Sequence, residues 1–410
     1  MPDIRVGAQI FDIAFHPTES LVYTGLLSGE VKAFSYDEQG NHECKFSVRP
    51  SKRSCRAIAV GHDGGKLWAG GKGKALHTID VATGVVADTR AAAHAAAINR
   101  MKPLLPHLLA TGDDDGVIKL WDPRKPDAIR AYAQHFDFIS DFLFLEDKKQ
   151  LVTTSGDGTL SVIDVRSKKT EPIAHSEDQE DELLSIVPIK GGQKFVVGTQ
   201  LGILSIFNRK SGWGDCVDRI PGHPHSVDAL CALPSRYPSA QSTVLTGSSD
   251  GLMRAVQLFP TKLLGVVADH GDFPVERIAI DQNGEGRWVG SAGHEEVLKL
   301  TDLNEIFEDE DDEDEDEKSN GGSEEDSDEG SGDEEDKATA AREDAKREDP
   351  DEEEDSDKDE VKEEDEADSS DEEPQQKKRK RKKEQDPLQA MKKRKGRNEV
   401  DAEPSFFADL

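Results

Sequence analysis

The chain has 410 residues, of which 85 are acidic and 52 basic, giving a formal net charge of −33, and only 34% are hydrophobic. No stretch approaches the roughly 18 apolar residues of a membrane-spanning helix, and the first residues lack the basic and apolar regions of a secretory signal. The four cysteines form no Cys-x-x-Cys pair, so the composition predicts a soluble intracellular protein without disulfides, metal sites or cofactors.

A repeat of about 44 residues organises residues 1–307. Each unit contains an apolar run, a turn and a second run in which apolar and polar residues alternate. Alternating runs of this length, bounded by Gly and Asp, predict strands joined as hairpins. A period of about 40–45 residues with several strands is typical of propeller blades, so we predict an all-β, seven-bladed β-propeller. The residues that open the second run in the seven units are Gly29, Lys74, Gly116, Gly158, Gly202, Gly251 and Glu296.

The N-terminus is predicted to complete the last blade. The second run of the seventh unit, residues 297–301, is followed almost at once by the acidic residues from Glu308 onward. This leaves no room for a further outer strand after the run. Residues 4–6 lie ahead of the first predicted strand and can supply the missing one, because a small sheet without its full set of strands is marginal.

The third unit resembles a WD repeat. Residues 108–122 read LLATGDDDGVIKLWD, with the Trp-Asp pair that names the repeat, and residues 155–164, SGDGTLSVID, are similar. On segments 11–17, 110–122 and 245–251 and on the order of the units, residues 9–303 resemble the WD-repeat protein 55 family, whose fungal members are of the Jip-five type. The resemblance implies a non-enzymatic scaffold that acts in nucleolar ribosome biogenesis and ribosomal RNA processing.

Histidine, hydroxyl and aspartate side chains recur in several units and invite a catalytic interpretation. In WD repeats such residues hydrogen-bond within a blade, and the resemblance assigns these roles to His94, Thr111, Asp115 and Trp121 in the third unit. A set repeated in several blades is typical of architecture, since an active site needs to occur only once. The turn 113–116 resembles part of a calcium loop but lacks its later Glu. The corresponding residues of the fourth unit are His135, Ser155 and Asp157.

Residues 121–124, Trp-Asp-Pro-Arg, indicate an alternative function. They match the Trp-Asp-x-Arg motif of propellers that serve as substrate receptors of cullin-4 ubiquitin ligases. In those receptors the arginine contacts the adaptor of the ligase, so the resemblance makes Arg124 a candidate adaptor contact. Residues 163–166 partly repeat the motif. A further alternative is a histone- or chromatin-binding adaptor, which would use the acidic residues near the C-terminus.

The excess of acidic residues lies after the repeats. Residues 1–307 have a net charge of only −7, whereas residues 308–373 carry 39 acidic and 7 basic side chains, a net charge of −32. This tract has too little apolar surface to offset chain entropy, so it is predicted to be disordered. Five serines precede an acidic residue by three positions, as in sites of casein-kinase type, and are candidate phosphosites: Ser323, Ser331, Ser356, Ser369 and Ser370.

The segment 374–399 reverses the sign, with 12 basic and 3 acidic residues. Its two basic clusters resemble a bipartite nuclear-import signal, which predicts an import receptor as partner and a nuclear, nucleolar location. Nonspecific contact with RNA phosphates is a compatible alternative, although no aromatic side chains are interleaved to stack on bases. The clusters consist of Lys377, Lys378, Arg379, Lys380, Arg381, Lys382, Lys383, Lys392, Lys393, Arg394 and Lys395.

The last segment, 400–410, contains a short apolar motif. Phe406, Phe407 and Leu410 are either a docking motif for a partner or for the propeller, or an inert end. Together these segments predict a monomer that works inside larger assemblies. The expected partners are pre-ribosomal assembly factors and ribosomal proteins, with no membrane.

Overall fold

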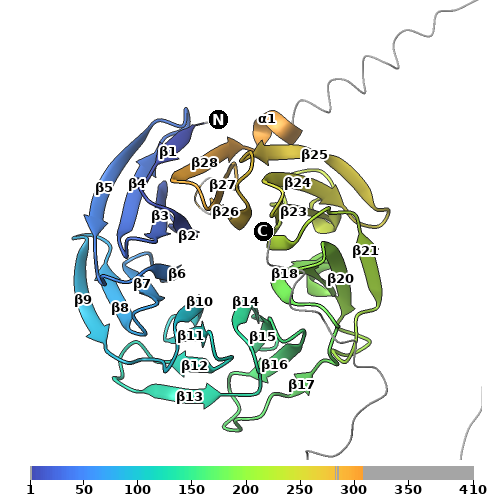
Figure 1. Ribbon diagram of the computed structural model, residues 1–410, viewed down its shortest axis with the longest axis horizontal. Helices are drawn as coiled ribbons and strands as arrows, with labels where there is room; N and C mark the ends of the chain where they lie inside the picture. Colours follow the sequence, from blue (N-terminus) through green and yellow to red (C-terminus); the bar gives the residue numbers. More distant parts are fainter. Residues whose placement is uncertain (1, 282, 284–285, 308–410) are drawn as a thin grey trace, which may run out of the picture. The chain divides into compact units, whose positions relative to one another are not determined.

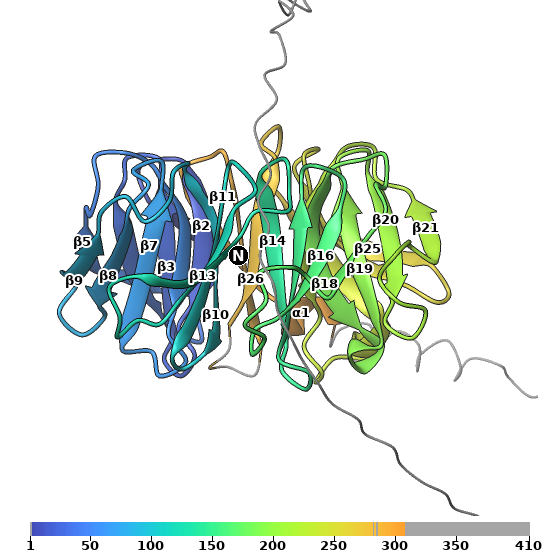
Figure 2. The ribbon, with the colours of Figure 1, turned by 90° about the horizontal axis from the view of Figure 1, so that it is seen from below.

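The computed structural model describes residues 2–281, 283 and 286–307, and these form seven four-stranded antiparallel sheets around a central axis (Figure 1). Seen from the side, the sheets stand next to one another as upright blades (Figure 2). The predicted seven-bladed propeller is therefore confirmed. The expectations for the acidic tract, the basic segment and the apolar end lie outside the described residues.

Each blade has an innermost strand beside the axis and a second strand packed against it. The innermost strands are β2 (Ile10–Phe15), β6 (Cys55–Val60), β10 (Ile98–Leu105), β14 (Ile139–Leu145), β18 (Leu183–Ile189), β22 (Val227–Ala232) and β26 (Val275–Ile280). The second strands are β3 (Leu21–Leu26), β7 (Lys66–Gly71), β11 (Leu108–Asp113), β15 (Gln150–Ser155), β19 (Lys194–Thr199), β23 (Thr243–Ser248) and β27 (Trp288–Gly293).

The third strand of each blade pairs with an outer strand at the rim (Figure 1). The third strands are β4 (Val31–Tyr36), β8 (Leu76–Asp80), β12 (Ile118–Trp121), β16 (Leu160–Asp164), β20 (Ile203–Asn208), β24 (Leu252–Gln257) and β28 (Val297–Asp302). The outer strands are β5 (His42–Val48), β9 (Val85–Arg90), β13 (Ala128–Tyr132), β17 (Ala174–His175), β21 (Asp218–Pro221), β25 (Lys262–Asp269) and β1 (Asp3–Arg5). The helical turns are η1 (Lys190–Gly192), η2 (Ala240–Ser242) and α1 (Asn304–Phe307).

Burial follows the position of each strand in its blade. Every residue of β11, β23 and β27 is buried, whereas most residues of β5 and β9 are exposed. The second strands consist largely of apolar and small residues, because both faces of each strand pack against neighbouring blades. The core therefore consists of clusters between adjacent blades rather than one central core.

The N-terminal strand occupies the outer position of the seventh blade, where the sequence placed it. Strand β1 pairs with β28, with Ile4 opposite Leu298, and the backbone N–H of Val6 donates to Glu296 O at 2.9 Å. The side chains of Ile4 and Val6 are 0% and 1% exposed and join the cluster between the seventh and first blades. The first and last segments of the propeller are thus held in one sheet.

The turns between second and third strands explain the repeated glycine. Gly29, Gly116, Gly158, Gly202 and Gly251 all have positive φ, between 77° and 83°. At Gly29 an added Cβ would lie 2.3 Å from the backbone oxygen of Ser51, so a side chain there would collide with the loop that connects β5 to β6. The repeat detected in the sequence is therefore a repeat of left-handed turn positions.

Candidate interaction face and blade networks

The third blade holds a buried hydrogen-bond network between its loop, second and third strands. The Nε2 atom of His94 lies 2.6 Å from Thr111 Oγ1, which also accepts a hydrogen bond of 2.8 Å from the indole N–H of Trp121. The other ring nitrogen of His94 lies 2.8 Å from Asp113 Oδ2. The hydroxyl of Thr111 therefore ties the loop before the blade to the tryptophan of the third strand.

The acidic partner of His94 corrects the sequence-based assignment. Asp115 is exposed on the turn, and the carboxylate bound to His94 is that of Asp113, at the end of β11. The second oxygen of Asp113 accepts the backbone N–H groups of Asp115 and Val117. A buried aspartate at the strand end can satisfy the histidine and the turn together, so the turn aspartate is not needed.

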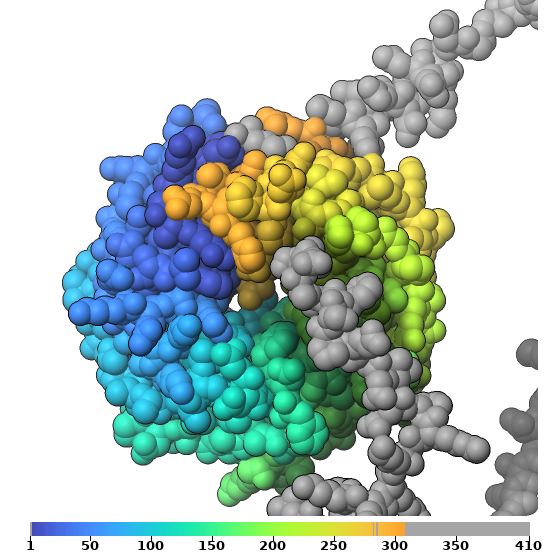
Figure 3. Space-filling model, in the orientation of Figure 1, coloured from blue at the N-terminus to red at the C-terminus, as the bar shows by residue number. Residues whose placement is uncertain are grey.

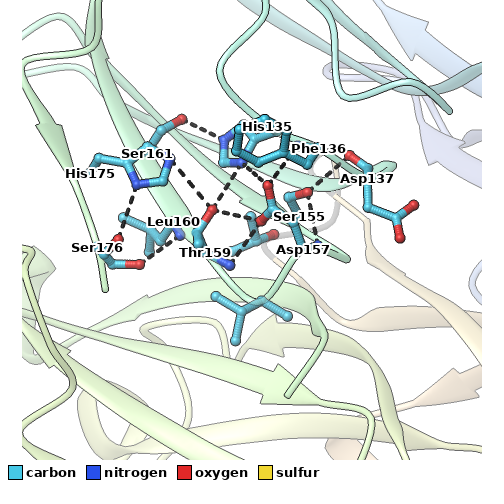
Figure 4. A network of polar contacts seen from close by, with 12 residues as sticks. His135, Phe136, Asp137, Ser155, Asp157, Thr159, Leu160, Ser161, His175 and Ser176 are labelled. Atoms are coloured by element: carbon cyan, nitrogen blue, oxygen red, sulfur yellow. Dashed lines mark hydrogen bonds and ion pairs between the residues drawn. The ribbon is translucent and has the colours of Figure 1, made fainter. Parts of the chain in front are cut away.

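The fourth blade builds the same link with different residues (Figure 4). Nδ1 of His135 lies 3.0 Å from Asp157 Oδ2, as the sequence analysis expected, but Nε2 lies 2.8 Å from Ser161 Oγ. Ser155 is not the partner of the histidine; its hydroxyl donates to Asp137 O and accepts the N–H of Asp157. Ser155 stands where the third blade has its longer aspartate, so the carboxylate must come from the turn.

The third strand of the fourth blade has no tryptophan, and this explains why a different hydroxyl contacts its histidine. Thr153 pairs with Ser161 as Thr111 pairs with Lys119, so Thr153 and Thr111 are equivalent positions. The fourth blade has Ile163 in place of a tryptophan, and the hydroxyl of Thr153 is buried without a hydrogen-bond partner. Ser161 supplies the hydroxyl for His135 instead.

Two further blades contain histidine networks that the sequence analysis did not assign in full. His270 contacts Ser291 Oγ at 2.8 Å and Glu295, and His223 lies 2.9 Å from Thr246 Oγ1. The signal that could have found them is the histidine that opens the third, fourth, sixth and seventh units. Burial lowers the pKa of His270, although Glu295 raises it, and burial likewise lowers the pKa of His223. These networks hold loops to strands within blades.

Loss of the Thr111 hydroxyl is expected to destabilise the propeller. Thr111→Val removes the acceptor of Trp121 and a partner of His94 in a site with no exposed surface, which we expect to cost about 1–3 kcal/mol. Urea denaturation of both proteins measures the difference. The matched change at the exposed Thr170, Thr170→Val, should leave the free energy of unfolding unchanged, and equal stability of the two variants would refute the network's role.

The Asp157 carboxylate gives the fourth blade a pH-dependent contribution to stability. Burial raises its pKa, but hydrogen bonds from His135, Thr159 and the N–H of Phe136 outweigh burial and hold the pKa well below its usual range. A lowered folded-state pKa stabilises the protein above the unfolded pKa of about 4, and this contribution is lost as the pH falls further.

Asp157→Asn is therefore expected to cost about 2 kcal/mol at pH 7 and progressively less between pH 5 and pH 3. Urea denaturation at several pH values measures this cost. Asp115→Asn, at the exposed turn residue, is the control and should cost nothing at any of them. A cost for Asp157→Asn that does not change with pH would contradict the assignment.

Arg124 lies on the turn after β12 with a side chain that is 71% exposed. Its guanidinium donates a bidentate pair of hydrogen bonds to the Asp122 carboxylate, from Nε to Oδ1 and from Nη2 to Oδ2, both at 2.8 Å. Arg166 makes the same bidentate contact with Asp164 at the same end of the fourth blade. The Asp-x-Arg pattern therefore fixes an arginine on the surface, with part of its hydrogen-bonding capacity already used.

An ionic cluster that the sequence analysis missed crosses the central axis. Arg100 from β10 lies 3.4 Å from Asp12 of β2 and 3.2 Å from Asp141 of β14, and Arg277 of β26 approaches Asp12 to 3.6 Å. Asp12 also accepts the N–H of Ile58 in the next blade at 2.8 Å. The cluster connects innermost strands on different sides of the ring.

The ionic cluster lies between the two openings of the axis. The space-filling view shows the hollow at the centre of the ring (Figure 3). One opening is a cavity of about 950 Å³ bordered by innermost strands, and the other is a smaller pocket of about 220 Å³. The smaller pocket is bordered by aromatic, apolar and charged side chains, among them Phe11, Phe138, Leu184, Asp228, Glu276 and Arg277.

Exposed apolar side chains surround the smaller pocket's end of the propeller, which we call the docking face. The docking face comprises the turns between second and third strands and the connections that lead into each innermost strand. On it, Phe136 is 92% exposed, Leu201 68%, Leu27 50% and Phe273 47%. Exposed apolar side chains that lie at one end of a fold make that end a candidate for contact with another protein.

The part of the chain that the structure describes contains neither a metal-binding cluster nor a membrane-spanning helix. No three His, Cys, Asp or Glu side chains in this part of the chain gather in a way that would hold a metal ion. Among the same residues, no helix has the length and apolar character needed to cross a bilayer.

Comparison with known proteins gives a consistent family. The WDR55 family profile matches residues 1–306. The chain is 64% identical over 324 residues to the WD repeat-containing protein JIP5 of Laccaria bicolor, covering 76% of this chain and 77% of the relative. It is 36% identical over 310 residues to WD repeat-containing protein 55 of Arabidopsis thaliana, covering 75% and 84%, and 34% identical over 305 residues to that of Rattus norvegicus, covering 74% and 77%.

Proposed function

The chain belongs to the WDR55 family of WD-repeat proteins, and from this premise we propose that it is a non-enzymatic scaffold of nucleolar ribosome biogenesis. In this role the propeller docks assembly factors or ribosomal proteins during ribosomal RNA processing. The observation that carries the proposal is the docking face, where Phe136 and Leu201 project into water. Side chains of this kind become buried only when a partner covers them.

Charge supports a basic partner for part of this face. The connection between the fourth and fifth blades, residues 176–182, carries five acidic residues and no basic ones. Within it, burial and the nearby Asp137 and Asp181 raise the pKa of Glu182, as expected where carboxylates crowd together. Ribosomal proteins are basic, so their charge complements this connection and the acidic tract 308–373.

Affinity purification of the full-length tagged chain, followed by mass spectrometry, tests the proposal. We expect ribosomal proteins and assembly factors to co-purify and to be lost as the salt concentration rises. Phe136→Ser with Leu201→Ser should reduce their recovery. The control carries Val85→Ser and Ile173→Ser, which remove two other exposed apolar side chains from the other end of the blades. Equal recovery with both variants would refute the docking face, and absence of ribosomal partners from the wild type would refute the function.

The nuclear location is part of the same proposal. The basic clusters at residues 377–383 and 392–395 would bind the import receptor. Replacing both clusters by glutamine in a fluorescent fusion of the full chain should leave the protein outside the nucleus. Nuclear and nucleolar fluorescence of the variant equal to that of the wild type would contradict this assignment.

The alternative function, a substrate receptor of a cullin-4 ligase, is favoured by Arg124 alone. This side chain is exposed and held by Asp122, and Arg166 repeats the arrangement in the next blade. Under the scaffold proposal, the full-length chain and Arg124→Ala should both fail to capture the purified ligase adaptor. Capture by the wild type that is lost in Arg124→Ala would establish the alternative instead.

A further inference from the structure

Two loops of the first and second blades place five exposed cations on the docking face. One loop connects β5 to β6, and the other is the turn between β7 and β8. We call this surface the basic patch, and it consists of Arg49, Lys52, Arg53, Lys72 and Lys74.

The two loops lie side by side. The backbone N–H of Lys72 donates to Ser54 O at 3.1 Å, and that of Arg53 donates to Ser51 Oγ at 3.0 Å. A Cβ added at Gly73 would lie 2.9 Å from Ser51 Oγ and 4.0 Å from the Cβ of Arg53. The small residues between the cations therefore let the two backbones meet, and the cations of both loops share one surface.

No carboxylate neutralises this surface within the described part of the chain. None of the five cations forms an ion pair there, and the ammonium group of Lys74 instead donates to the carbonyl of Ala95. The loops 27–30, 49–54 and 72–75 together carry five basic residues and one acidic residue, Glu30, whose carboxylate accepts from Ser28. The adjoining connection, residues 91–97, contains only alanines and His94.

We propose that the basic patch binds the phosphate backbone of RNA. Unpaired lysines and arginines bind polyphosphate chains by releasing condensed counterions, and arginine can contact a phosphate through two N–H groups. The three loops contain no aromatic residue on which bases could stack, so binding is independent of sequence. The acidic connection 176–182, between the fourth and fifth blades of the same face, has the opposite charge and repels RNA.

The acidic tract 308–373 is the competing occupant, and two observations favour RNA over it. The tract follows α1 at the end of β28, and third strands end at the face opposite the basic patch. The tract is also directly continuous with the segment 374–399, whose net charge is +9. The cations closest to the acidic tract along the chain are therefore those of the segment 374–399, and we assign the basic patch to an external polyanion.

Fluorescence anisotropy with the full-length protein and a labelled single-stranded RNA of about 20 nucleotides tests the proposal. The patch variant carries Lys52→Gln, Arg53→Gln and Lys72→Gln. The control carries Lys168→Gln, Lys169→Gln and Lys210→Gln, which remove three exposed cations from the opposite end of the blades. Thermal melting of both variants checks that the fold is retained.

We expect the patch variant to bind about 10- to 100-fold more weakly at 0.1 M salt. The slope of log affinity against log salt should fall by about 2, since each phosphate contact to a single strand contributes about 0.7. Two RNAs of different sequence should behave alike. Equal affinities of patch variant and control would overturn the proposal.

A lysine-acetylation footprint on the wild type locates the contact independently of the basic segment 374–399. RNA should protect Lys52, Lys72 and Lys74 and leave Lys168 and Lys169 reactive. Protection of the basic patch before RNA is added, with cross-links from it to residues 308–373, would overturn the proposal in favour of the acidic tract. Cross-links from the basic patch to the connection 176–182 of a second copy would overturn it in favour of self-association.

Discussion

Removal of residues 1–8 is expected to lower the melting temperature of the propeller by about 10 °C. These residues supply β1, the outer strand of the seventh blade, and Pro2 O also accepts the N–H of Leu300 at 3.1 Å. Burying Ile4 and Val6 contributes about 1.5–3 kcal/mol each, and the lost strand hydrogen bonds add to this. For a domain of this size, each kcal/mol shifts the melting temperature by about 2 °C.

Single substitutions in β1 separate the strand's buried face from its exposed face. Ile4→Ala should cost about 2–5 kcal/mol, because Ile4 is fully buried between the seventh and first blades. Arg5→Ala, on the exposed face of the same strand, should have little effect. Thermal denaturation measures both. An unchanged melt after removal of residues 1–8 would show that the ring does not depend on its N-terminal closure.

Loss of the Asp12 carboxylate is expected to cost about 3–5 kcal/mol. Burial raises the pKa of Asp12, even though Arg100, Arg277 and the N–H groups of Ile58 and Ile13 pull it down. Desolvation of the carboxylate thus outweighs the attraction of the two arginines, so the cluster contributes mainly by fixing positions. Removing one partner is nevertheless costly, because two guanidinium groups then remain near the axis with less opposing charge.

Asp12→Ala can be compared with the same change at an exposed aspartate. Asp37 also accepts two backbone N–H groups, from Gln39 at 3.0 Å and Asn41 at 2.8 Å, but it lies on the surface. Urea denaturation should show a large loss for Asp12→Ala and a small one for Asp37→Ala. Adding Arg277→Leu to Asp12→Ala should recover part of the loss. Equal losses for the two aspartates would contradict a stabilising role of the central cluster.

The number of blades and the closing strand could be predicted because both depend on local patterns. A left-handed turn recurs in most units. The acidic tract begins soon after β28, which is the third strand of the seventh blade. The partners within each network were harder to predict. Asp113 replaced Asp115, and Ser161 replaced Ser155, because the outcome depends on side-chain length and on whether a tryptophan occupies the third strand.

The central cluster and the basic patch could not be recognised from the sequence. Asp12 and Arg100 are 88 positions apart, and only the closed ring brings them together. The cations of loops 49–53 and 72–74 are visible in the sequence, but their proximity depends on Gly73 and Ser51 meeting at the top of the second blade. Repeats predict which blade a residue belongs to, whereas contacts between blades require the three-dimensional structure.

Sedimentation of the tagged full-length chain from nuclear extracts through a sucrose gradient tests whether the propeller acts on pre-ribosomal particles. A scaffold of ribosome biogenesis should sediment with pre-ribosomal particles at low salt and move to the light fractions as salt weakens its contacts with basic partners. Ribonuclease treatment before loading should release it from the particles. Sedimentation only with free protein at low salt, or association with chromatin that survives ribonuclease, would contradict a role in ribosome biogenesis.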